Sequence, residues 1–93
     1  MNIGKTYKVA SYSQTPVTLL HIIEQEEPNA DGDIVGRAIF VDSSVPQFVC
    51  WGFKYNPLRP DRIECFHGRY YKSLPRAIAQ ENLCERNSCP LEN

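Results

Sequence analysis

The residue types best able to do chemistry in this chain are four cysteines and two histidines: Cys50, Cys65, Cys84, Cys89, His21 and His67. Cys50, Cys65 and His67 could converge on neighbouring strands, and the Cys-x4-Cys pair near the C-terminus could then complete a zinc site. Structural zinc sites usually have two closely spaced ligand pairs, whereas fourteen residues separate Cys50 from Cys65. No spacing places either histidine beside a particular cysteine for nucleophilic catalysis. We therefore predict free thiols, no bound metal and no cofactor.

An acidic segment between Glu24 and Asp33 supplies the other candidate ligands. Asn29, Asp31 and Asp33 alternate as the oxygen ligands of a calcium loop do. Phe40, however, stands at the twelfth position, where the bidentate Glu belongs. A solvated turn is the better interpretation, because Asn and Asp side chains bond to nearby backbone. The chain also has no glycine-rich phosphate loop, no Ser-His-Asp order and no HExxH motif, so we predict that it is not an enzyme.

Cations and aromatic side chains gather between Lys54 and Arg76, a segment with six Lys or Arg residues and two acids. Three of these cations flank Ser73, a predicted helix start, where unpaired backbone N–H groups favour an anion. Arg and Tyr are also among the residues that contribute most of the binding energy at protein interfaces. The candidate partner-binding residues are therefore Tyr55, Arg59, Arg62, Arg69, Tyr71, Lys72 and Arg76.

Length and charge limit the function classes. A chain of 93 residues with a net charge of −1 buries too little surface for a deep catalytic cleft, and does not suit a surface built throughout for nucleic acid. We expect a non-enzymatic domain that occupies the surface of another protein. Small acidic α+β proteins without an active site are common among phage and mobile-element inhibitors of bacterial defence, such as anti-CRISPR proteins. A surface-covering domain of this kind could therefore be an inhibitor of that type. The alternatives are a nucleic-acid-binding protein that uses the Lys54 to Arg76 region, and a metal or thiol-redox protein.

The N-terminus and the apolar segments predict the compartment. No apolar stretch of the kind found in secretory signals follows Lys5. The longest apolar cluster, from Leu19 to Ile23, is interrupted by His21 and is too short to span a membrane. We expect a cytoplasmic protein without membrane contact, in which reduced thiols are favoured over disulfides.

Five strands and one helix must position these residues. Alternating and β-branched segments predict a strand over each of three ranges, Lys5–Tyr12, Val17–Gln25 and Ile34–Asp42, and then a hairpin with arms around Trp51 and Cys65. Ser73 is a good N-cap, so we expect a helix from there to near Asn87, with residues 88–93 frayed. The prediction is a single α+β domain over residues 1–93, an antiparallel meander of about five strands with one C-terminal α-helix packed on one face.

The predicted hairpin joins its arms through a six-residue loop, Asn56 to Asp61. If the loop closes symmetrically, Tyr55 faces Arg62, and Trp51 shares a face with Phe66, so we expect these two aromatic side chains to be buried together. A one-residue slip would regroup the faces. In either register both faces carry large apolar groups, and one helix covers only one of them. The other face is then a binding surface, or is closed by sheet curvature, a loop or a second subunit, and a homodimer by edge or face pairing is a further expectation.

Overall fold

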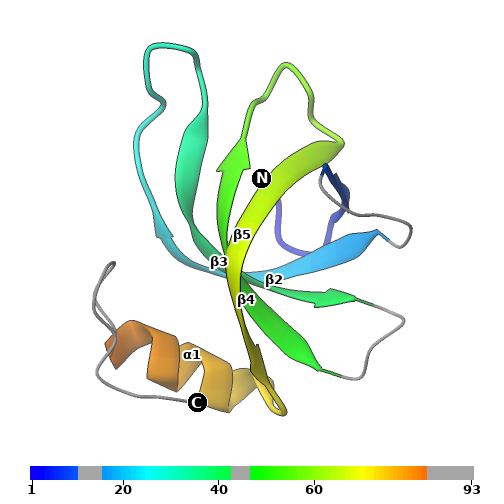
Figure 1. Cartoon of the computed structure of the whole chain (residues 1–93), viewed down its shortest axis with the longest axis vertical. Helices are drawn as coiled ribbons and strands as arrows, with labels where there is room; N and C mark the ends of the chain where they lie inside the picture. The colour runs from blue at the N-terminus through cyan, green and yellow to red at the C-terminus, as the bar shows by residue number, and fades with distance from the viewer. Residues whose placement is uncertain (11–15, 43–46, 84–93) are drawn as a thin grey trace.

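A computed structural model describes residues 1–10, 16–42 and 47–83, as five strands followed by one helix (Figure 1). The elements are β1 (Thr6–Val9), β2 (Val17–Gln25), β3 (Ile34–Asp42), β4 (Phe48–Tyr55), β5 (Arg62–Tyr71) and α1 (Leu74–Leu83). The predicted α+β class is confirmed, since the strands form one meander sheet and α1 packs against it. The first strand is shorter than predicted and ends at Val9. The predicted helix end near Asn87 and the C-terminal fraying lie outside the described residues.

The sheet closes into a barrel because β1 and β5 pair with each other. Consecutive strands are antiparallel, whereas β1 runs parallel to β5, with Lys8 opposite Arg62 and Val9 opposite Ile63. In a closed meander with an odd number of strands the first and last strands point the same way, so the closing pair has to be parallel. The expectation of a sheet with two free edges is therefore wrong, and a dimer through those edges loses its premise. A dimer through face packing stays a prediction.

The inner face of the barrel forms the larger hydrophobic core. Alternate strand residues point inward, and Tyr7, Leu19, Phe40 and Phe53 are fully buried there. Trp51 packs against Phe40 with ring centroids 5.5 Å apart. Curvature of the sheet thus closes the apolar face that the helix does not cover.

The outer face carries a smaller apolar cluster beneath α1. Cys50 and Tyr71, from the adjacent strands β4 and β5, cluster there with Ala77 of the helix. The helix begins where the sequence predicts, because the Ser73 Oγ accepts a hydrogen bond from the Arg76 amide at 3.2 Å. Figure 1 shows that α1 lies at one end of the molecule and that the β2–β3 and β4–β5 loops lie at the other.

The β4–β5 hairpin pairs one residue out of the symmetric register. Phe53 lies opposite Cys65, so Cys65 packs against the barrel core. The slip has its cause in the loop, where the Arg62 amide donates to the Arg59 carbonyl at 3.2 Å and does not pair with Tyr55. The loop therefore closes with the one-residue slip that the sequence left open as the alternative to symmetric closure.

A β-bulge in β5 then adds a second shift of one residue, which restores the predicted sharing of faces. Trp51 is opposed by two residues, His67 and Gly68, and His67 has a left-handed φ of 58°. Beyond the bulge, Tyr70 returns to the face that the symmetric register predicts. Before it, Phe66 lies on the outer face with 44% of its surface exposed. The predicted burial of Trp51 is confirmed, and the predicted burial of Phe66 beside it is wrong.

Replacing Trp51 with Ala should lower the free energy of unfolding by about 3–5 kcal/mol, because the indole fills the core against Phe40. Phe66→Ala is the matched control and should cost only about 1 kcal/mol, because nearly half of that side chain is already in water. Urea unfolding followed by circular dichroism measures both changes. Equal losses in the two variants would contradict the observed register.

Candidate binding surface

The structure divides the seven predicted binding residues between the two ends of β5. One group lies where β5 meets α1: Arg69, Tyr71, Lys72 and Arg76. The other group lies at the loop before β5: Tyr55, Arg59 and Arg62. A ten-residue strand is about 30 Å long, so one small contact cannot include both groups. Tyr55 and Tyr71 are 7% and 5% exposed, which leaves little of either ring available to a partner.

Arg69 and Tyr71 belong to a buried ion cluster around Glu81 of α1. The Glu81 carboxylate is fully buried and accepts two hydrogen bonds from the Arg69 guanidinium, both at 2.9 Å. It also accepts one from Arg37 of β3 at 2.6 Å and one from the Tyr71 hydroxyl at 2.5 Å. Arg37 in turn binds Glu24 of β2 at 2.8 Å. The cluster therefore ties α1 to three strands of the barrel.

The surroundings of Glu81 keep its carboxylate ionised. Burial raises the pKa of Glu81, but hydrogen bonds from Arg69 and Tyr71 and the charge of Arg69 outweigh burial, so the pKa lies below its usual value. Burial, reinforced by the charge of Glu81, raises the pKa of the Cys50 thiol to about 12. Burial also raises the pKa of Cys65 to about 12. Both cysteines are free, and neither has the low pKa that a nucleophilic thiol needs.

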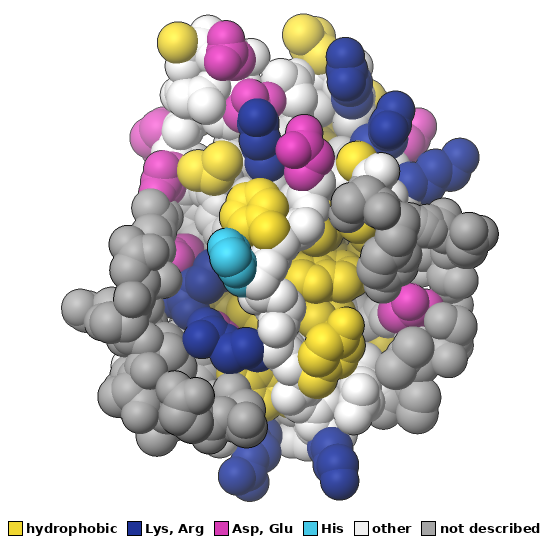
Figure 2. All heavy atoms as spheres, viewed as in Figure 1, with side chains coloured by type: hydrophobic (Ala, Val, Ile, Leu, Met, Phe, Trp, Pro, Cys, Tyr) yellow, Lys and Arg dark blue, Asp and Glu magenta, His cyan; other side chains and the backbone are white. Residues whose placement is uncertain are grey.

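Two large aromatic side chains of β5, Phe66 and Tyr70, are exposed to solvent, with 44% and 54% of their surface accessible. The Phe66 ring lies over Gly52 of β4, where an added Cβ would come within 2.8 Å of the ring. His67 meets the Phe66 ring edge-on, with ring centroids 5.9 Å apart. Strand β5 crosses the front of the barrel in Figure 1, and in the same view Figure 2 shows hydrophobic side chains along the middle of the surface, with Lys and Arg above and below. Phe66 points outward, whereas Tyr70, opposite Val49 and beyond the bulge, lies on the other side of the strand. We call these exposed side chains around the bulge, Phe66, His67 and Tyr70, the β5 face.

The sequence alone does not predict the β5 face, because the symmetric register places Phe66 in the core. Two glycines carried a signal that could have corrected this. Gly52 stands opposite Phe66 and leaves room for the ring on the outer face, and Gly68 follows His67 in the bulge, where a Cβ would come within 2.8 Å of the Trp51 indole. A glycine inside a strand often marks a bulge or a close approach of this kind.

Asn29 closes the acidic β2–β3 turn, as the sequence predicts. Its Oδ1 accepts hydrogen bonds from the amides of Asp31 at 2.9 Å and Asp33 at 3.0 Å. The Asp33 carboxylate accepts a hydrogen bond from Asn56 at 2.9 Å and lies 3.7 Å from the Lys54 ammonium. Protein groups therefore already neutralise this carboxylate.

Within the described residues, no group of three or more His, Cys, Asp or Glu side chains could hold a metal ion. Cys84 and Cys89, which the sequence analysis considered as zinc ligands, lie outside the described residues. No helix in residues 1–10, 16–42 and 47–83 is both long enough and apolar enough to cross a membrane.

Acidification should weaken the fold through Glu81. The pKa of Glu81 is lower in the folded protein than its ordinary value of 4.5, so the unfolded chain takes up protons first as the pH falls. The stability that Glu81 contributes is complete above about pH 4.5 and is lost as the pH falls through the folded pKa. Glu81→Gln should lose about 3–5 kcal/mol at neutral pH, because Arg37 and Arg69 lose their buried partner.

Urea unfolding between about pH 3 and pH 7 measures both effects of Glu81→Gln. The variant should show a weaker pH dependence of the free energy of unfolding than the wild type. Glu27→Gln is the control, because Glu27 is exposed, and it should keep the wild-type dependence. A Glu81→Gln variant with the wild-type pH dependence would disprove the assigned role of the carboxylate.

The thiols of Cys50 and Cys65 should react slowly in the folded protein, because burial raises both pKa values to about 12. A variant with Cys84→Ser and Cys89→Ser isolates these two thiols. Its reaction with a chromogenic disulfide at about pH 8 should be slow in native buffer and immediate in concentrated guanidinium chloride. A thiol that reacts at once in native buffer would show that the barrel opens or that the burial is incorrect.

The chain gives no significant match to a protein-family model, a curated protein or a solved structure. Its function therefore has to be argued from its own surfaces. The Glu81 cluster is buried and bonded internally, whereas the β5 face is exposed and held in place by the strands beneath it. Of these two, the β5 face is the one that a partner can reach.

Proposed function

We propose that this protein is a non-enzymatic protein-binding domain that covers a surface of its partner with the β5 face. The observation that carries the proposal is the exposure of Phe66 and Tyr70 on one strand of a closed barrel. Aromatic side chains are enriched at protein interfaces. A domain of this kind inhibits a partner when the covered surface is functional, which is the mode of action expected from the small size and acidity of the chain.

The β5 face is held in place before a partner arrives. The Phe66 ring lies against the Gly52 backbone, and the bulge at His67 orients the strand on both sides of it. Aromatic side chains that are already ordered lose little entropy on binding. The left-handed φ of His67 costs about 1–2 kcal/mol in a residue other than glycine, and local strain of this kind is concentrated at functional sites.

Exposed cations border the β5 face where β5 meets α1. Lys72 and Arg76 are exposed, and within the described residues neither forms an ion pair. Arg76 lies in the first turn of α1, which has no acidic residue, and a cation there opposes the helix dipole by roughly a few tenths of a kcal/mol. Carboxylates on a partner would offset this cost. We therefore infer that the partner presents acidic groups around an apolar centre.

A nucleic-acid partner suits this surface less well. The cations of the Lys54 to Arg76 region are divided between the two ends of β5, and Glu64 and the aromatic β5 face lie between them. The chain as a whole has a net charge of −1. A groove that follows a phosphate backbone needs cations along its length.

The test is capture of partners from a lysate of the source cells by the immobilised wild type and by the Phe66→Ala/Tyr70→Ala variant. We expect a protein that the wild type retains and that the variant binds at least about thirtyfold more weakly, because interface hot spots contribute about 2 kcal/mol or more. Ile3→Ala is the matched control, since Ile3 is 64% exposed in the N-terminal segment, and it should retain the same protein.

Equal capture by the double variant, while it remains folded, would rule out the β5 face as the contact surface. Nuclease treatment separates the two classes of partner. If it abolishes capture, and if log K falls with log salt by about 0.9 for each contacted phosphate, the partner is duplex DNA and the protein-binding proposal is wrong.

A further inference from the structure

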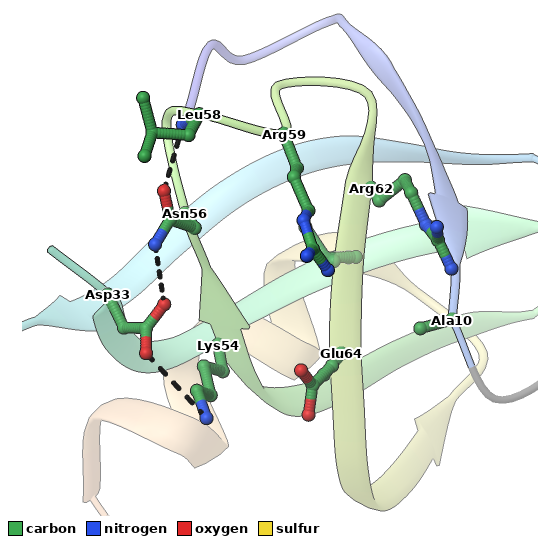
Figure 3. A pocket seen from close by; sticks show the side chains of 9 residues that line it. Ala10, Asp33, Lys54, Asn56, Leu58, Arg59, Arg62 and Glu64 are labelled. Atoms are coloured by element: carbon green, nitrogen blue, oxygen red, sulfur yellow. Dashed lines mark hydrogen bonds and ion pairs between the residues drawn. The ribbon is translucent and has the colours of Figure 1, made fainter. Parts of the chain in front are cut away.

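A polar hollow of about 360 Å³ lies beside the β4–β5 loop, at the end of the barrel away from α1 (Figures 1 and 3). The lining residues that matter here are Asp33, Lys54, Asn56, Arg59, Arg62 and Glu64. The volume is in the range of small-molecule sites in proteins. The hollow shares no residue with the β5 face, so it is a second, separate surface.

One wall of the hollow is built from groups that bond to each other. Asn56 donates from Nδ2 to the Asp33 carboxylate at 2.9 Å and to the Asp31 carbonyl at 3.2 Å. The Asn56 Oδ1 accepts from the Leu58 amide at 2.8 Å, which fixes the start of the loop. The Lys54 ammonium lies 3.7 Å from the Asp33 carboxylate. The charges of Lys54 and Asp33 therefore cancel, and this wall is ordered without a ligand.

The opposite side of the hollow carries two arginines that are placed there by successive turns. The Arg59 amide donates to the Asn56 carbonyl at 2.8 Å, and the Arg62 amide donates to the Arg59 carbonyl at 3.2 Å. In Figure 3 the two side chains flank the loop end of β5, Arg59 on the side of Asn56 and Arg62 on the side of Ala10. Within the described residues, neither guanidinium forms an ion pair.

The charges that line the hollow leave one positive charge uncompensated. Lys54 and Asp33 neutralise each other, and Glu64 offsets one of the two arginines. Two guanidiniums at one concave surface repel each other, and the walls concentrate their field on the space between them. An anion in that space would relieve the repulsion and would accept hydrogen bonds from both planar forks.

The geometry points to a binding site for a small organic oxyanion, a phosphate or a carboxylate, held between the Arg59 and Arg62 guanidiniums. Glu64 restricts what the rest of the ligand can be, because its carboxylate repels a second anionic group and accepts hydrogen bonds from donors. The ligand therefore has its oxyanion at the arginines and a hydroxyl or ammonium group toward Glu64. A small hydroxylated phosphate or hydroxy acid has this pattern.

The test is titration of the full ¹⁵N-labelled chain at constant ionic strength with three probes that share one carbon skeleton. Glycerol 3-phosphate carries the phosphate, glycerate carries the carboxylate, and glycerol carries neither. We expect saturable shifts of the backbone amides of Asn56, Leu58, Arg59 and residues 61–64 and of the Arg59 and Arg62 Nε–H groups with at least one anion, and none with glycerol. The anion that binds more tightly identifies the head group.

Variants separate a built site from general charge attraction. Arg59→Gln with Arg62→Gln should weaken binding at least about tenfold, whereas Arg76→Gln, an exposed cation at the other end of β5, should change it less than about twofold. Arg59→Lys with Arg62→Lys keeps the charge without the planar fork and should bind with intermediate affinity. The absence of saturable shifts with either anion up to about 10 mM, or an equal effect of Arg76→Gln, would overturn the proposal.

Discussion

A buried carboxylate in α1 sets the arrangement of the outer face. Removal of an ionised carboxylate from water costs several kcal/mol unless charged partners and hydrogen bonds replace the water. Glu81 meets that condition where Arg37 approaches from β3 and where Arg69 and Tyr71 approach from β5. A shift of α1 by one turn, or of β5 by one residue, would separate these groups. The cluster thus fixes both the position of α1 and the register of the strands beneath it.

The Glu81 cluster can form only because of the β-bulge at His67. Before the bulge, the even-numbered residues Glu64 and Phe66 point outward, because the loop has shifted the register by one residue. Without an extra residue the same alternation would turn Arg69 and Tyr71 inward and away from Glu81. The bulge inverts the alternation, so that both side chains reach the carboxylate. The ion cluster and the left-handed His67 therefore depend on each other, and the exposure of Phe66 follows from the same change of register.

The strands and the helix could be predicted because they depend on local sequence signals. The strand register and the Glu81 cluster could not, because they depend on contacts between residues far apart in the sequence. Strands β2 and β3 have the predicted bounds, and α1 starts at its Ser73 cap, because β-branched runs and capping residues act within a few positions. The ion cluster instead depends on a distant pair, since the Arg37 partner of Glu81 lies 44 residues away in the sequence. The β1–β5 closure also joins distant segments. At the candidate sites, charge alone singled out Arg59 and Arg62, whereas the exposure of Phe66 required knowledge of the slip and the bulge.

Some cations of this chain form internal ion pairs and others are available to a partner. The net charge of −1 does not distinguish the two groups. Arg37 and Arg69 bind Glu81, and Lys54 pairs with Asp33. The available cations, without such a pair among the described residues, lie at the two ends of β5: Arg59, Arg62 and the neighbouring Lys8 of β1 at one end, and Lys72 and Arg76 at the other. Adjacency in the sequence made all of these side chains look like one surface. Because the strand between its ends is held by β4 and by the Glu81 cluster, the two ends cannot fold together around one ligand, and each has to be explained by a partner of its own.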